Sequence, residues 1–398
     1  MQRQAALYVH IPYCLAKCPY CDFNSYAART WPEAEYAAAL ERELAHHAAS
    51  EPFRDAEIAT IFFGGGTPSL FEPKTIARLL DAAARELRVA ADAEITLEAN
   101  PGTVEEGRLR GFRAAGVNRM SFGVQSFQPE LLEALGRRHS VDDSRAALAA
   151  ARRAGFENLS LDLIYAVPGQ SLAACEADVD EAIAIAPDHV SAYNLTYEKG
   201  TAMFRDLSAG RIAPAGEELE IAMFRTVGDR LAAAGYARYE ISNYARPGRA
   251  ARHNQAYWRG LPYLGLGAGA HSFAPADDAG SARAPGEAAD GAAFGARWEN
   301  LRDPNRYREA VAARGSAIAS RESLTRAQAM GEACWLGLRE TRGIDAEGFR
   351  RRFGEPLADA FPHVAELARE GLVEWRGEEL VLTERGLLLA DGVFASFL

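Results

Sequence analysis

The sequence predicts an α/β protein: a partial barrel of six βα units followed by a smaller α+β module of winged-helix type. Two observations support the barrel: short apolar runs alternate with amphipathic helical patterns over residues 1–236, and most of these runs end in glycine or polar residues. A third supports the module, because closely spaced amphipathic helices and two short strands follow from about Arg306. We therefore expect domains at 1–236 and 306–398, joined by a connecting segment at 237–305.

The predicted strands of the barrel are short and separated by one helix each. They cover residues 7–11, 58–63, 94–98, 119–123, 159–164 and 190–195. The helices between them cover residues 31–49, 72–87, 104–115, 142–154 and 172–185, and another follows at 216–234. Because strand–helix–strand units form parallel sheets with right-handed crossovers, we expect all six strands to run in one direction.

Candidate site residues fall at the ends of these strands. Each of the first five strands has one candidate residue at or near its end, namely Cys14, Gly65, Glu98, Gln125 and Asp162. In parallel barrels the reactive groups gather at the carboxyl ends of the strands. The sequence therefore predicts one site on that face.

Composition limits the class of protein. The 398 residues include 44 basic and 55 acidic side chains, for a net charge of -11, which disfavours general binding to nucleic acid. No apolar run is long enough to cross a bilayer, and the first residues leave no room for a signal peptide. We expect a cytoplasmic protein, in a compartment that keeps thiols reduced.

Three of the five cysteines, Cys14, Cys18 and Cys21, lie in the stretch YVHIPYCLAKCPYCDFN with the spacing CxxxCxxC. Three thiolates on one loop can hold three corners of a metal cluster and leave the fourth metal without a protein ligand. A structural zinc site would need a second pair of ligands, and Cys175 and Cys334 are single and distant. A disulfide framework would need an even local count and a secreted context. The cluster is therefore the favoured interpretation.

Two glycine-rich stretches suit a close backbone approach to some neighbour, and a tight turn is the alternative for the first of them. The first, Gly64-Gly65-Gly66-Thr67-Pro68-Ser69, ends the second predicted strand. The second is GLGAGAHS at 265–272, which is too rich in glycine for a helix interior. A segment with period-two alternation precedes it at 236–245, and an exposed loop is expected at 274–295.

These motifs together resemble the radical SAM superfamily: CxxxCxxC closes the first strand, Tyr20 precedes the last cysteine, and GGGTPS closes the second strand. The resemblance implies a 4Fe-4S cluster on Cys14, Cys18 and Cys21, with S-adenosylmethionine on the open iron. It is strongest to the oxygen-independent coproporphyrinogen III oxidase group and covers nearly the whole chain. By this resemblance Tyr8 and Tyr20 flank the adenine and the cluster. Gly65, Gly66 and Thr67 hold the methionine end, Glu98 holds the ribose or the amino group, and Gln125, Arg137 and Asp162 complete the pocket.

Two departures separate this chain from the oxidases. Phe23 stands where they carry a further cysteine, and their extension before the first strand is missing. The stretch His253-Asn254-Gln255-Ala256-Tyr257-Trp258 instead resembles the HNxxYW signature of HemW-type heme chaperones. That resemblance implies heme as ligand, His253 as its axial ligand, and transfer to client hemoproteins such as respiratory enzymes; it leaves open a homodimer and a peripheral membrane association through clients. A buried, hydrogen-bonded histidine is the structural alternative.

Two other functions stay open, and no catalytic residue is assigned. One is a coproporphyrinogen oxidase or another tetrapyrrole-modifying enzyme on the same scaffold. The other is a nucleic-acid regulator that uses the winged module, which the net acidity disfavours.

Overall fold

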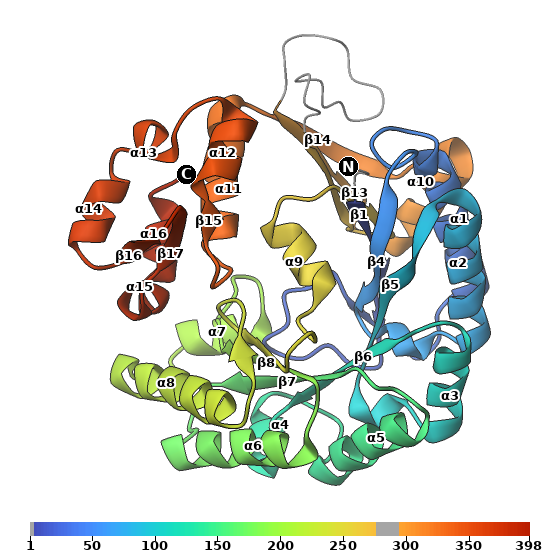
Figure 1. The fold of residues 1–398 in the computed structure, drawn as a ribbon. Coiled ribbons are helices and arrows are strands. Elements are labelled where there is room, and N and C mark those ends of the chain that lie inside the picture. The colour runs from blue at the N-terminus through green and yellow to red at the C-terminus, as the bar shows by residue number, and fades with distance from the viewer. Residues whose placement is uncertain (1–3, 276–293) are drawn as a thin grey trace.

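The computed structural model describes residues 4–275 and 294–398. Six parallel strands stand in the predicted order and form a curved sheet (Figure 1). They are β1 (Gln4–Ile11), β4 (Glu57–Gly65), β5 (Arg88–Ala99), β6 (Arg119–Gln125), β7 (Leu159–Tyr165) and β8 (His189–Asn194). The prediction of an α/β fold built on six parallel strands is confirmed.

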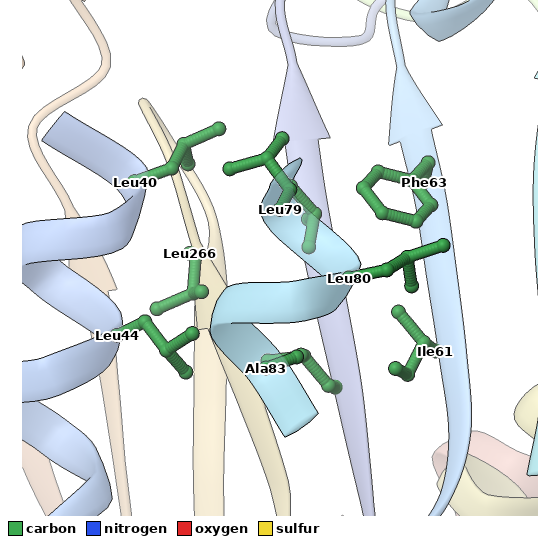
Figure 2. A pocket seen from close by; sticks show the side chains of 10 residues that line it. Leu40, Leu44, Ile61, Phe63, Leu79, Leu80, Ala83 and Leu266 are labelled. Atoms are coloured by element: carbon green, nitrogen blue, oxygen red, sulfur yellow. The ribbon is translucent and has the colours of Figure 1, made fainter. Parts of the chain in front are cut away.

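Helices cover the convex face of this sheet (Figure 1). The long ones are α1 (Glu33–Ala48), α2 (Pro73–Glu86), α3 (Glu106–Ala114), α5 (Val141–Arg153), α6 (Leu172–Ile185) and α8 (Glu217–Ala233); α4 (Pro129–Ala134) and α7 (Ala202–Ser208) are short. Figure 2 shows side chains of α1 and α2, among them Leu40, Leu44 and Leu79, packed against the sheet. The space left there is about 10 Å³, which is room for about one water molecule. The space between these side chains is therefore part of the core and too small for a ligand.

The connecting segment extends the sheet at both edges, joined on one side by β14 (Ile318–Leu324) from the domain expected at 306–398. Beyond β1 lie β11 (Tyr263–Leu266), which is parallel to it, and the antiparallel strands β12 (His271–Pro275), β13 (Gly295–Asn300) and β14. Beyond β8 lie β10 (Asn243–Ala245) and β9 (Ala237–Arg238), which account for the period-two segment. Most of the loop expected at 274–295 lies outside the described residues. The segment at 237–305 is thus part of the sheet, not only a connection.

The C-terminal module has its own core, formed by residues from Leu324 onward together with Phe273 of β12. A three-stranded sheet of β15 (Ile344–Asp345), β17 (Glu379–Leu382) and β16 (Val373–Arg376) lies among short helices. These are α11 (Arg326–Gly337), α12 (Ala346–Phe353), α13 (Leu357–Ala360), α14 (Val364–Arg369), α15 (Glu384–Leu388) and α16 (Ala390–Ala395). Before it, α10 (Pro304–Arg314) packs into the first core through Tyr307 and Val311, so the second core starts later than the expected boundary at Arg306. α13 and α14 are separate helices, because Pro362 between them lacks the N–H that a helix interior needs.

The helix α9 (Arg252–Trp258) lies on the concave side of the barrel (Figure 1). Its first backbone N–H groups, of Arg252 and His253, donate to the carboxylate of Glu94 on β5 at 3.3 and 3.2 Å. A carboxylate at a helix N-terminus satisfies donors that have no partner within the helix. The HNxxYW stretch is therefore fixed inside the barrel. Within residues 4–275 and 294–398 we find no helix with the length and hydropathy that crossing a bilayer requires.

Candidate functional site

The three clustered cysteines lie on the loop after β1 as free, half-buried thiols. Two short strands, β2 (Tyr13–Cys14) and β3 (Tyr26–Ala27), brace the ends of this loop. Each sulfur has a hydrogen-bond partner on another side chain. Thr67 Oγ1 donates to Cys14 Sγ at 3.5 Å and Arg137 Nη1 to Cys18 Sγ at 3.4 Å, and Ser25 Oγ, which can donate or accept, lies 3.9 Å from Cys21 Sγ.

The surroundings of the thiols suit an anionic metal cluster. Burial raises the pKa of Cys14 and Cys21, so a bound metal would have to supply the positive charge that favours their thiolates. Among the residues described, no three Cys, His, Asp or Glu side chains are placed to share a single metal ion. In a 4Fe-4S cluster each cysteine binds a different iron, so three separate sulfurs with hydrogen-bond donors fit that group.

A chain of polar contacts joins two of the cysteines across the strand ends. Asn100 Nδ2 donates to Thr67 Oγ1 at 2.8 Å, and Arg137 Nη2 donates to Asn100 Oδ1 and, at 2.7 Å, to the carbonyl of Gly123. Arg137 Nη1 also lies 3.5 Å from the hydroxyl of Tyr20. Arg137 Nε is buried and has no hydrogen-bond partner in the described part of the chain. This atom is a donor that a carboxylate-bearing ligand could use.

Asn100 is a site residue that the sequence prediction missed. It directly follows the strand that carries Glu98, and this position was the available signal.

The glycines at the end of β4 lie very close to β1 and to the start of the cysteine loop. A Cβ on Gly65, whose φ is 109°, would lie 2.4 Å from the ring of His10, and a Cβ on Gly66 would lie 2.6 Å from the carbonyl oxygen of Tyr13. Backbone hydrogen bonds of 2.8 Å run from Gly66 N to Ile11 O and from Thr67 N to Tyr13 O. The loop is therefore fixed against the cysteine loop before any ligand binds.

Two carboxyl groups interact in the barrel. Glu98 Oε2 accepts from the N–H of Gly65 at 3.2 Å, while burial, with a further contribution from the charge of Asp162, raises the pKa of Glu98 to about 8. Burial raises the pKa of Asp162 to about 6, although a hydrogen bond from Ser191 acts in the opposite direction and lowers it. Such groups can accept hydrogen bonds from hydroxyl or ammonium groups of a ligand. At the end of β6, Gln125 has a φ of 72°, a left-handed conformation that is rare for a residue with a side chain and often found at functional sites.

Tyr8 connects the barrel interior to the cysteine loop through residues that the sequence prediction did not select. Its hydroxyl lies 3.0 Å from His10 Nδ1, and His10 Nε2 lies 2.9 Å from the carbonyl of Asn24. The Asn24 amide donates to the carbonyls of Ala268 and Arg302 at 2.8 and 2.9 Å. The predicted close approach of the GLGAGAHS stretch is thus an approach to the cysteine loop.

The side chain of His253 is not accessible to a ligand in this structure. Its side chain is buried, with Nδ1 2.8 Å from Thr60 Oγ1 and Nε2 2.9 Å from the Tyr257 hydroxyl, and its ring stacks on Phe62 with centroids 5.0 Å apart. Burial lowers the pKa of His253 to about 3, so the ring is neutral. An axial ligand needs a nitrogen lone pair that faces the iron, and both nitrogens are already engaged. The role of His253 as a heme ligand stays a prediction, and it would require α9 to move.

The sequence-predicted residues therefore form two groups. The first gathers around the cysteine loop and comprises Cys14, Cys18, Tyr20, Thr67 and Arg137. The second lies deeper, where Gly65 and Glu98 are in contact and the charge of Asp162 acts on Glu98. Tyr8 stacks on Phe62, next to His253.

Comparisons with known proteins agree with this arrangement. A family model described as the Radical SAM superfamily matches residues 8–182, and one described as the HemN C-terminal domain matches residues 324–389. The structure is similar to a solved coproporphyrinogen III oxidase, HemN, from Escherichia coli, with a TM-score of 0.82 and 25% identity over 100% of this chain and 90% of that one.

Relatives in sequence are similar over two thirds of their length or more. "Heme chaperone HemW" of Bacillus subtilis is 35% identical over 98% of both chains. "Radical S-adenosyl methionine domain-containing protein 1, mitochondrial" of Danio rerio is 37% identical over 96% of this chain and 83% of its own. "Heme chaperone HemW" of Escherichia coli is 45% identical over 67% of this chain and 69% of its own. The fold, the site and these similarities together show that the chain belongs to the HemW family of radical SAM proteins.

Proposed function

We propose that this protein is a heme chaperone that binds heme and transfers it to client hemoproteins. The observation that carries the proposal is the 35% identity, over 98% of both chains, to a relative named as a heme chaperone. The HNxxYW stretch and the absence of a cysteine at Phe23 support it. The cytoplasmic location expected from the sequence is part of the same proposal.

The residues around the cysteine loop would hold the cofactors. Cys14, Cys18 and Cys21 would bind three irons of a 4Fe-4S cluster, and the donors on their sulfurs would stabilise its negative charge. The residues that would hold S-adenosylmethionine are Tyr8, Tyr20, Gly65, Gly66, Thr67, Glu98, Gln125, Arg137 and Asp162. When bound, this pair of cofactors supplies one-electron chemistry. The protein's own contribution is to position the ligand: Arg137 offers a buried donor and Glu98 and Asp162 offer acceptors.

A second candidate is a coproporphyrinogen III oxidase, which the similarity to the HemN structure favours. Anaerobic incubation with coproporphyrinogen III, a reductant and S-adenosylmethionine separates the two functions. Vinyl product would establish the oxidase and overturn the chaperone.

The proposed chaperone function is tested by measuring the transfer of heme to an apoprotein. Anaerobically reconstituted protein is loaded with hemin, freed of excess ligand and mixed with apomyoglobin, and the Soret band of holomyoglobin is followed. We expect faster transfer than from hemin bound to serum albumin.

A matched pair of variants tests the cluster. Cys18→Ser should lose most of the bound iron, at least tenfold, whereas Cys334→Ala, which removes a buried thiol in the other core, should retain it. Equal iron content in the two variants would remove Cys18 from the cluster.

A further inference from the structure

Large apolar side chains are exposed on the cysteine loop. Leu15, Phe23 and Tyr26 are 45%, 64% and 38% exposed, and none of them belongs to a buried hydrophobic cluster of the described residues. Several large apolar side chains exposed on one loop of a soluble protein indicate a binding site more than a single exposed residue does. The other exposed large hydrophobic side chains in residues 4–275 and 294–398 are Tyr193, Trp375, Leu389 and Leu398. This surface lies beside the three thiols and is distinct from the buried His253.

Two of the three apolar residues have a cationic group on their backbone carbonyl, and the third contacts the backbone of Arg302. Lys17 Nζ donates to the carbonyl of Phe23 at 2.9 Å, and Arg138 Nη1 lies 3.5 Å from the carbonyl of Leu15. The Tyr26 hydroxyl donates to the carbonyl of Arg302 at 3.1 Å.

The same region contains two exposed acids, Asp22 and Asp303, against the exposed cations Lys17, Arg138 and Arg302. These five residues together carry a charge of +1, on a chain whose net charge is -11. Apolar area bordered by cations suits a flat apolar molecule that carries carboxylates.

We propose that Leu15, Phe23 and Tyr26, with Lys17, Arg138 and Arg302, form the docking surface for heme. We call these six residues the loop surface. The porphyrin plane packs on the apolar side chains, and the two propionates face the cations. This inference rests on the proposed function, since it assumes that heme is the ligand.

The loop surface explains two features that the fold alone does not. Phe23 occupies the position of an additional cysteine in the oxidases, yet its ring is exposed and stabilises neither core. Because His253 is buried and both its ring nitrogens are hydrogen-bonded, heme needs a surface that is accessible without a movement of α9.

The test is a titration with hemin, followed by the Soret band, on anaerobically reconstituted protein. The double variant Leu15→Ser/Phe23→Ser should bind hemin at least tenfold more weakly than the wild type. Trp375→Ser is the matched control, because it removes an aromatic side chain of similar exposure, 43%, from the C-terminal module. Iron content and the absorbance of the cluster are measured in every variant to show that the loop still holds it.

Arg138→Gln provides an independent arm, because Arg138 lies outside the cysteine loop. It should weaken hemin binding about threefold or more and leave the binding of heme dimethyl ester, which lacks free propionates, unchanged. Equal hemin affinity of the wild type and the double variant would overturn the loop surface as a heme site. A double variant that binds hemin normally but transfers it more slowly would also overturn it, and would indicate that clients dock there. If the wild type itself does not bind hemin, the proposed function fails.

Discussion

The cysteine loop and helix α9 both carry sequence motifs of the same barrel, yet their chemical surroundings are opposite. The loop presents half-buried thiols and a 64% exposed phenyl ring, and its cations face solvent. In α9, His253 is 1% exposed and both ring nitrogens are hydrogen-bonded. The difference teaches that a motif does not tell by itself whether its polar atoms are available to a ligand. Availability depends on what the rest of the chain packs against them.

The far end of α9 has a structural role as well. Arg259, next to the helix, pairs with Glu340 at 2.9 Å, and Gln255 donates to the same carboxylate at 3.1 Å. The guanidinium of Arg339 lies 4.5 Å from the Trp258 ring. A cavity of about 130 Å³ lies between this end of the helix and the C-terminal module. The HNxxYW helix thus links the barrel interior to that module.

Replacing His253 gives the sharpest test of this contrast. His253→Ala removes a buried ring and leaves the Thr60 and Tyr257 hydroxyls without their partner, so the free energy of unfolding should fall by about 3 kcal/mol. Phe23→Ser removes an exposed ring and should change it by less than about 0.5 kcal/mol. Urea unfolding followed by circular dichroism measures both. Equal effects would contradict the division between a structural helix and an open loop.

Much of this arrangement could be predicted from the sequence, because it depends on local patterns. Strand–helix alternation located the six parallel strands, and cysteine spacing located the loop. The sheet extension from β11 to β14 was missed, because its first strand continues into the glycine-rich stretch at 265–272, which has little β propensity. The contacts of Asn24 and Asn100 were also missed, since they join residues far apart in the chain. Burial of His253 depends on the position of α9 in the barrel, which no local pattern encodes.

A glycine substitution tests how the glycine-rich stretch at 265–272 supports the cysteine loop. A Cβ on Gly269, whose φ is 74°, would lie 2.5 Å from the amide nitrogen of Asn24, whereas a Cβ on Gly155, whose φ is 92°, meets nothing within 4 Å. Both alanine variants carry the backbone strain of a positive φ, about 1 kcal/mol, but only Gly269→Ala also displaces Asn24. We expect a loss of about 2 kcal/mol and reduced iron incorporation for Gly269→Ala, measured by urea unfolding and iron analysis.

The double variant Gly269→Ala/Asn24→Ala identifies the cause. If the clash with Asn24 is responsible, the two substitutions should be less destabilising together than the sum of their separate effects. Strict additivity, or an equal loss for Gly155→Ala, would show that Gly269 matters only for its own backbone.

A pH-dependent effect is expected at Glu43, which anchors the glycine-rich stretch at 265–272 behind the cysteine loop. Its buried carboxylate accepts from Gly267 N at 2.9 Å, Asn300 Nδ2 at 2.7 Å and Tyr307 Oη at 2.6 Å, yet burial outweighs these bonds and raises the pKa of Glu43 to about 7. Between pH 4.5 and 7 the folded state therefore holds a proton that the unfolded state has released, so this group's contribution makes stability fall as the pH rises. The slope from this one group is at most about 1.4 kcal/mol per pH unit. Glu43→Gln should remove that slope from the pH profile of urea unfolding, and Glu35→Gln at an exposed position of α1 serves as the control. An unchanged slope in Glu43→Gln would mean that Glu43 stays ionised in the fold and that its three donors outweigh its burial.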